Sequence, residues 1–392
     1  SSLAFESAKV LPKGIRSVTL KNVHTQVNSK TDSEGDIEPL ATPLEKEINY
    51  GRILKGEKGT KRDLLAAFLE ENGLKLTDSL GQFNADLKAK VDVYASLFSY
   101  GLTDRLTAAF VVPYYNAKSR VAISFRPDTM RANKFISLLS DPIYNQTESA
   151  REVASKLNGA VSELNKKLRD NGFHELADWE GSGLGDLTLA GKYLVFTSPM
   201  LQVATLTGTT LPTGRVKDPN LLNDIPFGKG TYGFFTQAIA DIKNDAMVLN
   251  QSFKYTYYLP GSRNLRYVTE DESIEIDSGR TGFKLGDELL YNISMQHEMN
   301  FGLMSGLGFV FSKKYTDHYL IENNQESKSK LQADTDQRAT YWEAKVGYSG
   351  INAYKSGLIP APFIASVEYK RHIASISSLK NDFITADLSL FF

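Results

Sequence analysis

Charged side chains alternate with apolar ones along residues 86–99. The polar set starts with Asp86, Lys88, Lys90 and Asp92, and every residue between them is apolar. Successive side chains of a β-strand point to opposite faces, so this stretch predicts one charged face and one apolar face. Charges at this spacing can pair across strands or line a path through water. The alternation runs beyond the roughly 5–6 residues of a typical soluble strand and suits a tilted strand that crosses a bilayer.

Further charged residues fall on the polar face of later strand candidates. Together with the four above, we predict that they line the lumen of a barrel: Lys192, Lys254, Glu288, Glu343, Lys345, Glu368, Lys370 and Asp387. Two interpretations remain open. The charges can pair across strands and fill a narrow interior, or they can line a water path for small solutes. Because both signs are present, steep ion selectivity is not expected.

Residues for metal or nucleophilic chemistry are not grouped in a recognisable pattern. The five histidines fall in no metal-ligand spacing, and cysteine is absent. Ser294 and His297 belong to opposite faces of one strand candidate, which argues against a hydrolytic pair. We therefore expect no enzyme activity, catalytic residue, metal site or cofactor, and keep a barrel enzyme only as a remote alternative.

The composition limits the class of protein. The 392 residues are 41% hydrophobic with a net charge of −1, so no global field attracts nucleic acid. Mean hydropathy is −0.29, and no run of about 18 apolar residues predicts a membrane-spanning helix. The 19 tyrosines and 21 phenylalanines suit aromatic girdles. The chain opens on SSLAFESAK without methionine, from which we expect a signal peptide that has been removed.

Alternation predicts about twelve strands, an even number typical of bacterial barrels. They are expected at residues 15–27, 86–99, 106–115, 184–196, 201–211, 231–242, 246–259, 285–297, 301–312, 339–348, 362–372 and 383–392. Short and long connections alternate between these strands, as the short periplasmic turns and long external loops of outer-membrane barrels do. We predict an all-β fold in one domain, residues 1–392: a transmembrane antiparallel β-barrel, or a barrel-like wall, with external helical insertions at 28–84 and 126–183.

The two insertions contain the helix candidates. Residues 63–72 carry apolar residues on one side and end before Gly73. Ser149 and Glu152 fit a capping box, and apolar residues then recur at helical spacing from Val153 to Leu168. We expect this helix to pack on neighbouring protein and to lie outside the cell.

Three further groups of residues have predicted roles at the membrane. Aromatic residues near the long-loop ends of their strands are expected to form a girdle: Tyr114, Tyr255, Tyr257, Phe309, Phe311, Tyr341 and Trp342. The last strand, with Leu388, Leu390 and Phe392 on one face, resembles the C-terminal signal that outer-membrane assembly machinery reads. The strand at 201–211 has no continuous apolar face, so Ala204, Leu206 and Gly208 are expected at a subunit interface.

Two resemblances accompany this pattern. GLGDLTLAGK at Gly183–Lys192, LPTG at Leu211–Gly214 and YGLTDRLTAAFVVPY at Tyr100–Tyr114 resemble the outer-membrane family linked to phenol degradation by the meta pathway. These are barrel-turn motifs, so the resemblance implies a fold more than a substrate. AKVLPKG at Ala8–Gly14 and the second helical insertion resemble the porin-like major outer-membrane protein of predatory bacteria. That resemblance implies a ring-shaped oligomer, such as a pentamer, that encloses lipid.

These observations predict an integral outer-membrane protein of a Gram-negative bacterium. Its expected function is porin-like passive passage of small or hydrophobic solutes, within a homo-oligomer. The alternative is a structural oligomer that encloses or shapes lipid without conducting. Expected partners are outer-membrane lipids, further copies of the chain and the assembly machinery. The sequence leaves open the solute, the oligomer number, whether the helices plug the lumen and whether each protomer closes its own barrel.

Overall fold

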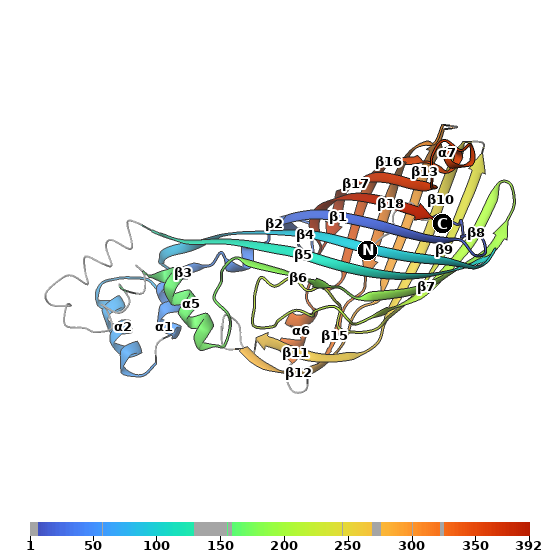
Figure 1. The fold of residues 1–392 in the computed structure, drawn as a ribbon. Helices are drawn as coiled ribbons and strands as arrows, with labels where there is room; N and C mark the ends of the chain where they lie inside the picture. Colours follow the sequence, from blue (N-terminus) through green and yellow to red (C-terminus); the bar gives the residue numbers. More distant parts are fainter. Residues whose placement is uncertain are drawn as a thin grey trace.

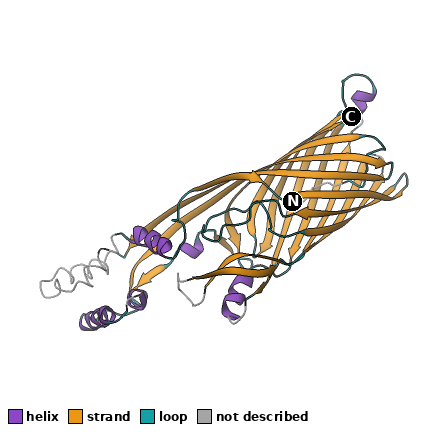
Figure 2. Ribbon diagram, turned by 60° about the horizontal axis from the view of Figure 1, so that its bottom comes forward, coloured by secondary structure: helices purple, strands orange, loops and turns teal. Residues whose placement is uncertain are grey.

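Twelve antiparallel strands form a closed barrel. A computed structural model describes residues 7–56, 58–128, 155, 159–244, 246–268, 276–299, 301–321 and 325–392. The strands in ring order are β1 (Arg16–Thr31), β4 (Ser79–Thr103), β5 (Leu106–Pro127), β7 (Leu187–Thr197), β8 (Leu201–Leu211), β9 (Gly233–Asn244), β10 (Met247–Tyr258), β13 (Glu288–Glu298), β14 (Leu303–Lys314), β16 (Gln337–Ser349), β17 (Phe363–Ile376) and β18 (Leu379–Phe391). β1 pairs with both β18 and β4, which closes the ring within one chain (Figures 1 and 2).

The predicted strand number, order and alternation of loop length are confirmed. Tight turns join β4 to β5, β7 to β8 and β9 to β10 at one end. A short helix, α7 (Ile351–Lys355), lies at this end as well, in a connection that the sequence pattern did not single out. The long connections emerge at the opposite end. From the asymmetry of bacterial barrels, we expect the tight turns to be periplasmic and the long loops to be external.

Two strands extend far beyond the barrel. β4 has 25 residues and β5 has 22, and their pairing continues outward to Gly81 and Pro127. This β4–β5 ribbon carries helices α1 (Tyr50–Gly56), α2 (Thr60–Glu71) and α5 (Ala160–Asp170) near its outer end (Figure 1). Of the short elements, β2 (Ile37–Pro39) pairs with β1, β3 (Glu47–Asn49) pairs with β4 and β6 (Trp179–Leu184) pairs with β5. The 3-10 turn η1 (Thr42–Leu44) lies between β2 and β3 in the chain.

Small apolar cores hold the helices on the ribbon. Tyr50, Leu65 and Leu69 are buried against Leu80 of β4. Leu168 of α5 packs with Phe173 and Leu176, next to Val121 and Ile123 of β5. The helix predicted at 63–72 is confirmed by α2. Of the second predicted helix, the structure describes α5, whereas the capping box falls outside the described residues. Within the described part of the chain, no helix combines the length and apolarity needed to cross a membrane.

A second, three-stranded sheet lies near the external mouth of the barrel. It contains β11 (Gly261–Val268), β12 (Ile276–Lys284) and β15 (His318–Leu320), with α6 (Gln325–Gln332) beside it. Its core joins Phe283 and Tyr319 to Tyr258 at the end of β10. The sequence pattern predicts loops here, because these short strands lack sustained alternation. Their pairing depends on partners distant in the sequence.

The fold predicts which end of the barrel faces the outside of the cell. Because cysteine is absent, Lys88→Cys on the outer half of β4 and Arg105→Cys in a short turn each introduce a single thiol. A membrane-impermeant maleimide should label Lys88→Cys on intact cells. It should label Arg105→Cys only after the outer membrane is broken. The reverse order of labelling would contradict the orientation.

Candidate functional site: the interior of the barrel

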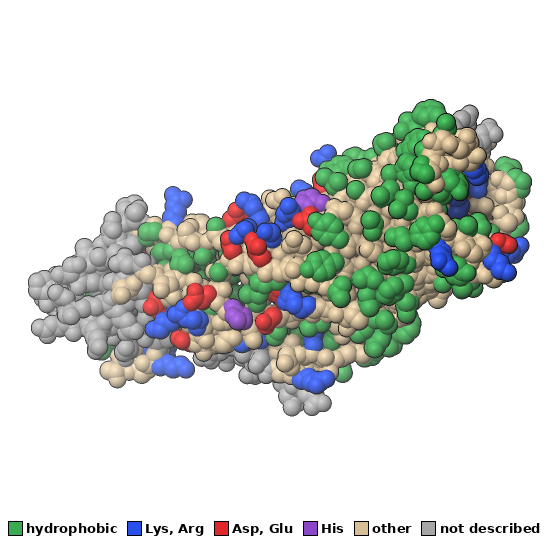
Figure 3. All heavy atoms as spheres, viewed as in Figure 1, with side chains coloured by type: hydrophobic (Ala, Val, Ile, Leu, Met, Phe, Trp, Pro, Cys, Tyr) green, Lys and Arg blue, Asp and Glu red, His purple; other side chains and the backbone are tan. Residues whose placement is uncertain are grey.

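Burial distinguishes the inner face of the wall from the outer face. In β9, Phe235, Ile239 and Asp241 are only 6%, 1% and 1% exposed, whereas Phe234 and Ile242 are 48% and 44% exposed. A closed barrel in a single chain covers its inner face only, so the buried set points into the lumen. Because paired residues on neighbouring strands point to the same side, the pairing registers extend this assignment of inner and outer faces to every strand of the barrel. Apolar side chains accordingly cover the outside of the barrel in Figure 3.

A charged wall faces the lumen along β16, β17, β18 and β1. Glu343 is fully buried, and its carboxylate lies 3.6 Å from the Lys370 amine and accepts a 2.8 Å hydrogen bond from Asn292. Lys370 also lies 3.8 Å from Glu368. Farther along, Lys21 and Asp387 are 3.5 Å apart. These contacts are those of charges that pair across strands, one of the two interpretations left open by the sequence.

Eight of the twelve predicted lumen residues point inward by this register. Lys192 donates to the Ser7 carbonyl, Lys254 lies 4.2 Å from the centre of the Phe235 ring, and Glu288 pairs with Lys229 at 2.5 Å. Lys345 lies opposite Glu368 in the register. Glu343, Glu368, Lys370 and Asp387 belong to the charged wall.

The prediction is wrong for Asp86, Lys88, Lys90 and Asp92, which project from the outer face of β4. His24 on the outer face of β1 contacts Asp92 at 2.7 Å, which fixes the side. The reason is the length of β4. Its charged first half belongs to the ribbon outside the lipid, where an outer face meets water. Its outer face becomes apolar only from Tyr94 onward, with Tyr94, Phe98 and Tyr100 all exposed.

A charged belt surrounds the base of the ribbon on this outer face. Arg120 donates to Asp178 at 2.7 Å and to Glu180 at 2.9 Å, and Lys118 also contacts Glu180. A hydrogen bond from the Val121 amide and the Arg120 guanidinium both lower the pKa of Asp178 below its usual value. The belt appears in Figure 3 where the ribbon meets the apolar barrel surface.

The inner face of β4 and β5 is an apolar strip. It contains the residues that alternate with the charges: Leu87, Ala89, Val91, Val93, Ala95 and Leu97 on β4, with Ala109, Val111, Pro113 and Tyr115 on β5. All of these side chains are partly exposed. Leu87, Ala89 and Val91 belong to the outer half of β4, so the part of the strip inside the barrel runs from Val93 to Leu97 on β4 and from Ala109 to Tyr115 on β5. The strip adjoins the charged wall through β1. The lumen therefore has one apolar side and one side of paired charges.

The N-terminal segment, residues 7–14, lies inside the lumen near its periplasmic end. The Asp241 carboxylate accepts hydrogen bonds from the Ser7 hydroxyl and the Ala8 amide at 2.8 and 2.9 Å. Ala8 is fully buried against β8 and β9. The Leu11 amide donates to the Thr107 hydroxyl of β5 at 2.8 Å. The segment thus lies along the inner wall of the neighbouring strands β5, β7, β8 and β9 and narrows the lumen on that side.

A folded loop narrows the external mouth. The Arg215 guanidinium donates to both Asp224 oxygens, at 2.9 and 2.5 Å, and lies over the rings of Trp179 and Phe227. Phe227 is buried and stacks on Tyr115 at 5.3 Å. Since Tyr115 ends the apolar strip, this aromatic group lies where the strip reaches the outside. The helices of the ribbon lie away from the barrel and do not cover this mouth (Figure 2).

Most predicted girdle residues lie on the outer surface. Tyr114, Tyr255, Tyr257, Phe309 and Phe311 are each 36–49% exposed. Trp342 also faces outward and packs edge-on against Tyr369. Tyr341 does not belong to the girdle. It shares the inner face with Glu343 and packs against His372 and Phe383. Leu388, Leu390 and Phe392 of the predicted assembly signal form an exposed apolar face.

The candidate subunit interface lies inside the barrel. Ala204 and Leu206 are buried against Ala8 of the N-terminal segment and Phe235. A β-carbon on Gly208 would lie 2.5 Å from the Phe235 ring and 2.4 Å from a backbone oxygen. The lack of a continuous apolar face on β8 is thus explained by the chain that covers it from within. The predicted role of these three residues in oligomer contact is wrong.

Sequence reasoning missed three inner-face residues that hold this arrangement together. They are Lys21, Asp241 and Asn292, which contact Asp387, the N-terminal segment and Glu343. Asp241 and Asn292 are nearly completely buried. The available signal was a polar residue on the inner face of a strand, but the partner of Asp241 is more than 230 positions away. Among the described residues, no group of histidine and acidic side chains has the arrangement of a metal site.

Comparisons with known proteins give one family match and several similar solved structures. The protein family described as "Putative MetA-pathway of phenol degradation" matches residues 77–350. An outer membrane channel from Pseudomonas putida F1 has a similar structure, with a TM-score of 0.56, 11% identity and 100% of both chains covered. The Pseudomonas putida toluene transporter TodX gives a TM-score of 0.37 at 11% identity, covering 97% of this chain and 90% of TodX. A search of curated protein sequences finds no match.

The buried ion pair predicts a specific pattern of stability. Glu343→Ala leaves Lys370 buried without its nearest carboxylate, which should cost about 3–5 kcal/mol. Removing both charges with Glu343→Gln and Lys370→Met should recover most of this loss. The stability of both variants is measured by unfolding in detergent, which is monitored through the heat-dependent shift in gel migration. If the double variant were as unstable as Glu343→Ala, the pairing would not be what stabilises this wall.

The attachment of the N-terminal segment predicts a second change. Asp241→Ala removes the two hydrogen bonds from Ser7 and Ala8 to a buried carboxylate, each worth about 1.5–3 kcal/mol, together with a 2.6 Å bond from Asn250. Backbone hydrogen exchange at residues 7–11 should then accelerate at least tenfold. The control is Asp104→Ala, which removes an exposed contact to the Lys13 amide and should leave residues 7–11 unchanged. Equal exchange in Asp241→Ala and the parent chain would show that other contacts hold the segment.

Proposed function

Because the chain belongs to the family described as "Putative MetA-pathway of phenol degradation" and is an integral outer-membrane β-barrel, we propose that it is a passive channel for small apolar solutes, aromatic compounds in particular. The observation that carries the proposal is the apolar strip along the inner face of β4 and β5. The family description supports the aromatic class.

The strip supplies a continuous surface on which an apolar solute can leave water. Covering about 100 Å² of apolar surface stabilises a bound solute by about 2.5 kcal/mol. This is weak enough for rapid release, as passage through a channel requires. The neighbouring charges are paired, so they offer an ion little free charge. These properties favour uncharged solutes over ions.

The two narrow points of the lumen determine where passage is controlled. At the external mouth, Phe227 and Tyr115 present aromatic surface at the start of the strip. At the periplasmic end, residues 7–14 lie along the inner wall next to the strip, so a solute leaves the strip beside Leu11 and Pro12. The hydrogen bonds to Asp241 hold this segment against the wall.

The alternatives predict different behaviour. A structural oligomer that encloses or shapes lipid needs no apolar strip inside the barrel and predicts no passage of solute. A barrel enzyme gains no support from Ser294, because it points into the lumen whereas His297 is on the opposite face of β13. Assembly into a homo-oligomer, in a ring of unspecified size, stays a prediction that native mass measurement tests.

A substitution in the strip tests the proposed function. Leu97→Gln places an amide in the strip near its periplasmic end and should lower the initial rate of toluene or phenol uptake by cells about tenfold, because the solute then crosses a polar interruption. Leu97→Met keeps the surface apolar and should retain near-normal uptake. Uptake is measured with labelled solute in cells that lack the native chain. If cells with and without the protein take up solute equally, the structural alternative is favoured.

A further inference from the structure

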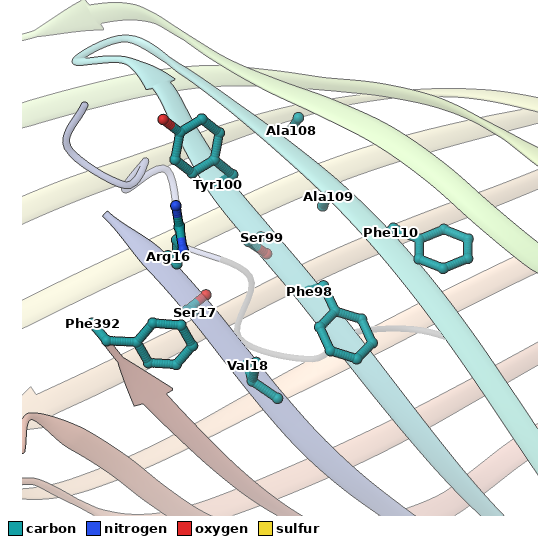
Figure 4. A pocket seen from close by; sticks show the side chains of 10 residues that line it. All are labelled: Arg16, Ser17, Val18, Phe98, Ser99, Tyr100, Ala108, Ala109, Phe110 and Phe392. Atoms are coloured by element: carbon teal, nitrogen blue, oxygen red, sulfur yellow. The ribbon is translucent and has the colours of Figure 1, made fainter. Parts of the chain in front are cut away.

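A groove on the outside of the barrel lies at the periplasmic end of β1, β4 and β5. It encloses about 410 Å³ and is lined by Arg16, Val18, Phe98, Tyr100, Ala108, Phe110 and Phe392, with Ser17, Ser99 and Ala109 beneath them (Figure 4). The groove exists because Ala108 lies opposite Tyr100 in the register and fills little of the space between the larger side chains. Apart from Arg16, every outward side chain in the groove is apolar or aromatic.

Arg16 is a cation on a lipid-facing surface. Its guanidinium carbon lies 6.0 Å from the centre of the Tyr100 ring, and within the described part of the chain it forms no ion pair. The backbone of Arg16 pairs with that of Phe392, so its position on the wall is fixed. An arginine in the hydrocarbon region costs about 2–4 kcal/mol, and the cost disappears when the guanidinium reaches the headgroup level.

The arrangement of one cation beside an apolar surface suits the binding of one amphiphilic molecule. A planar guanidinium matches the oxygens of a phosphate in a two-pronged hydrogen bond. Val18, Phe98 and Phe110 continue from Arg16 toward the membrane centre, where an acyl chain lies. A second copy of this wall would instead set an apolar surface against Arg16 and leave its charge uncompensated. We propose that the groove is a binding site for one inner-leaflet glycerophospholipid, with its phosphate on Arg16 and an acyl chain along Val18, Phe98 and Phe110.

Native mass spectrometry of the full chain tests this site. The protein is exchanged into detergent that contains phosphatidylglycerol or phosphatidylethanolamine, and adducts that survive increasing collision energy are counted. The parent chain should retain one phospholipid of either class after the others are lost. Arg16→Gln removes the phosphate contact and should lower occupancy about tenfold. Ala108→Trp fills the groove and should remove the adduct, whereas Arg16→Lys should keep part of it.

The control is Arg105→Gln, which removes an exposed cation of the β4–β5 turn at the same end of the barrel. It should leave occupancy unchanged, and heat-dependent gel migration should confirm that each variant folds. If Ala108→Trp does not fold, Ala108→Leu replaces it. The proposal is overturned if Arg16→Gln and Arg105→Gln retain equal phospholipid. It is also overturned if the groove variants change native mass from oligomer to monomer without a change in bound phospholipid.

Discussion

A lipid bilayer supplies no water to the peptide backbone, and this constraint determines the rest of the structure. Every amide and carbonyl within the hydrocarbon must find a partner in the protein, so a membrane-spanning sheet has to close on itself. Here the closure depends on β1, whose two edges pair with β18 and β4. Once the ring is closed, each side chain belongs either to the lipid face or to the lumen.

The lumen is built from two kinds of surface that the same alternation produces on neighbouring strands. On β16, β17 and β18 the inward residues include charges that pair across strands, as Glu343 does with Lys370. On β4 and β5 the inward residues are apolar. Backbone closure alone would permit either arrangement. The N-terminal segment then covers part of the inner wall at β8 and β9, where Ala204 and Leu206 are buried.

The sequence was sufficient to predict the class of fold, because strand length, strand number and loop parity follow from patterns within a few residues. It was not sufficient to decide which face of β4 points inward. Charged and apolar residues alternate regularly along that strand, so either set could face the lumen. The charged residues lie outside the membrane rather than inside the barrel. A usable signal existed, since the same face becomes aromatic at Tyr94, Phe98 and Tyr100, as a lipid-facing wall requires. Contacts such as Ser7 with Asp241 join distant positions and leave no local pattern.

The closure of the barrel also has a consequence for the rate of folding. Thr19 of β1 and Ser389 of β18 form a hydrogen bond across 370 positions, so this seam is among the least local contacts in the chain. Contacts between distant positions form slowly, because the entropy of closing a long loop is lost before any stabilisation is gained. The hairpins from β4 to β17 can form early, whereas the seam has to wait for both ends. Until it forms, the exposed edges of β1 and β18 are the part of the chain most open to pairing with the wrong strand.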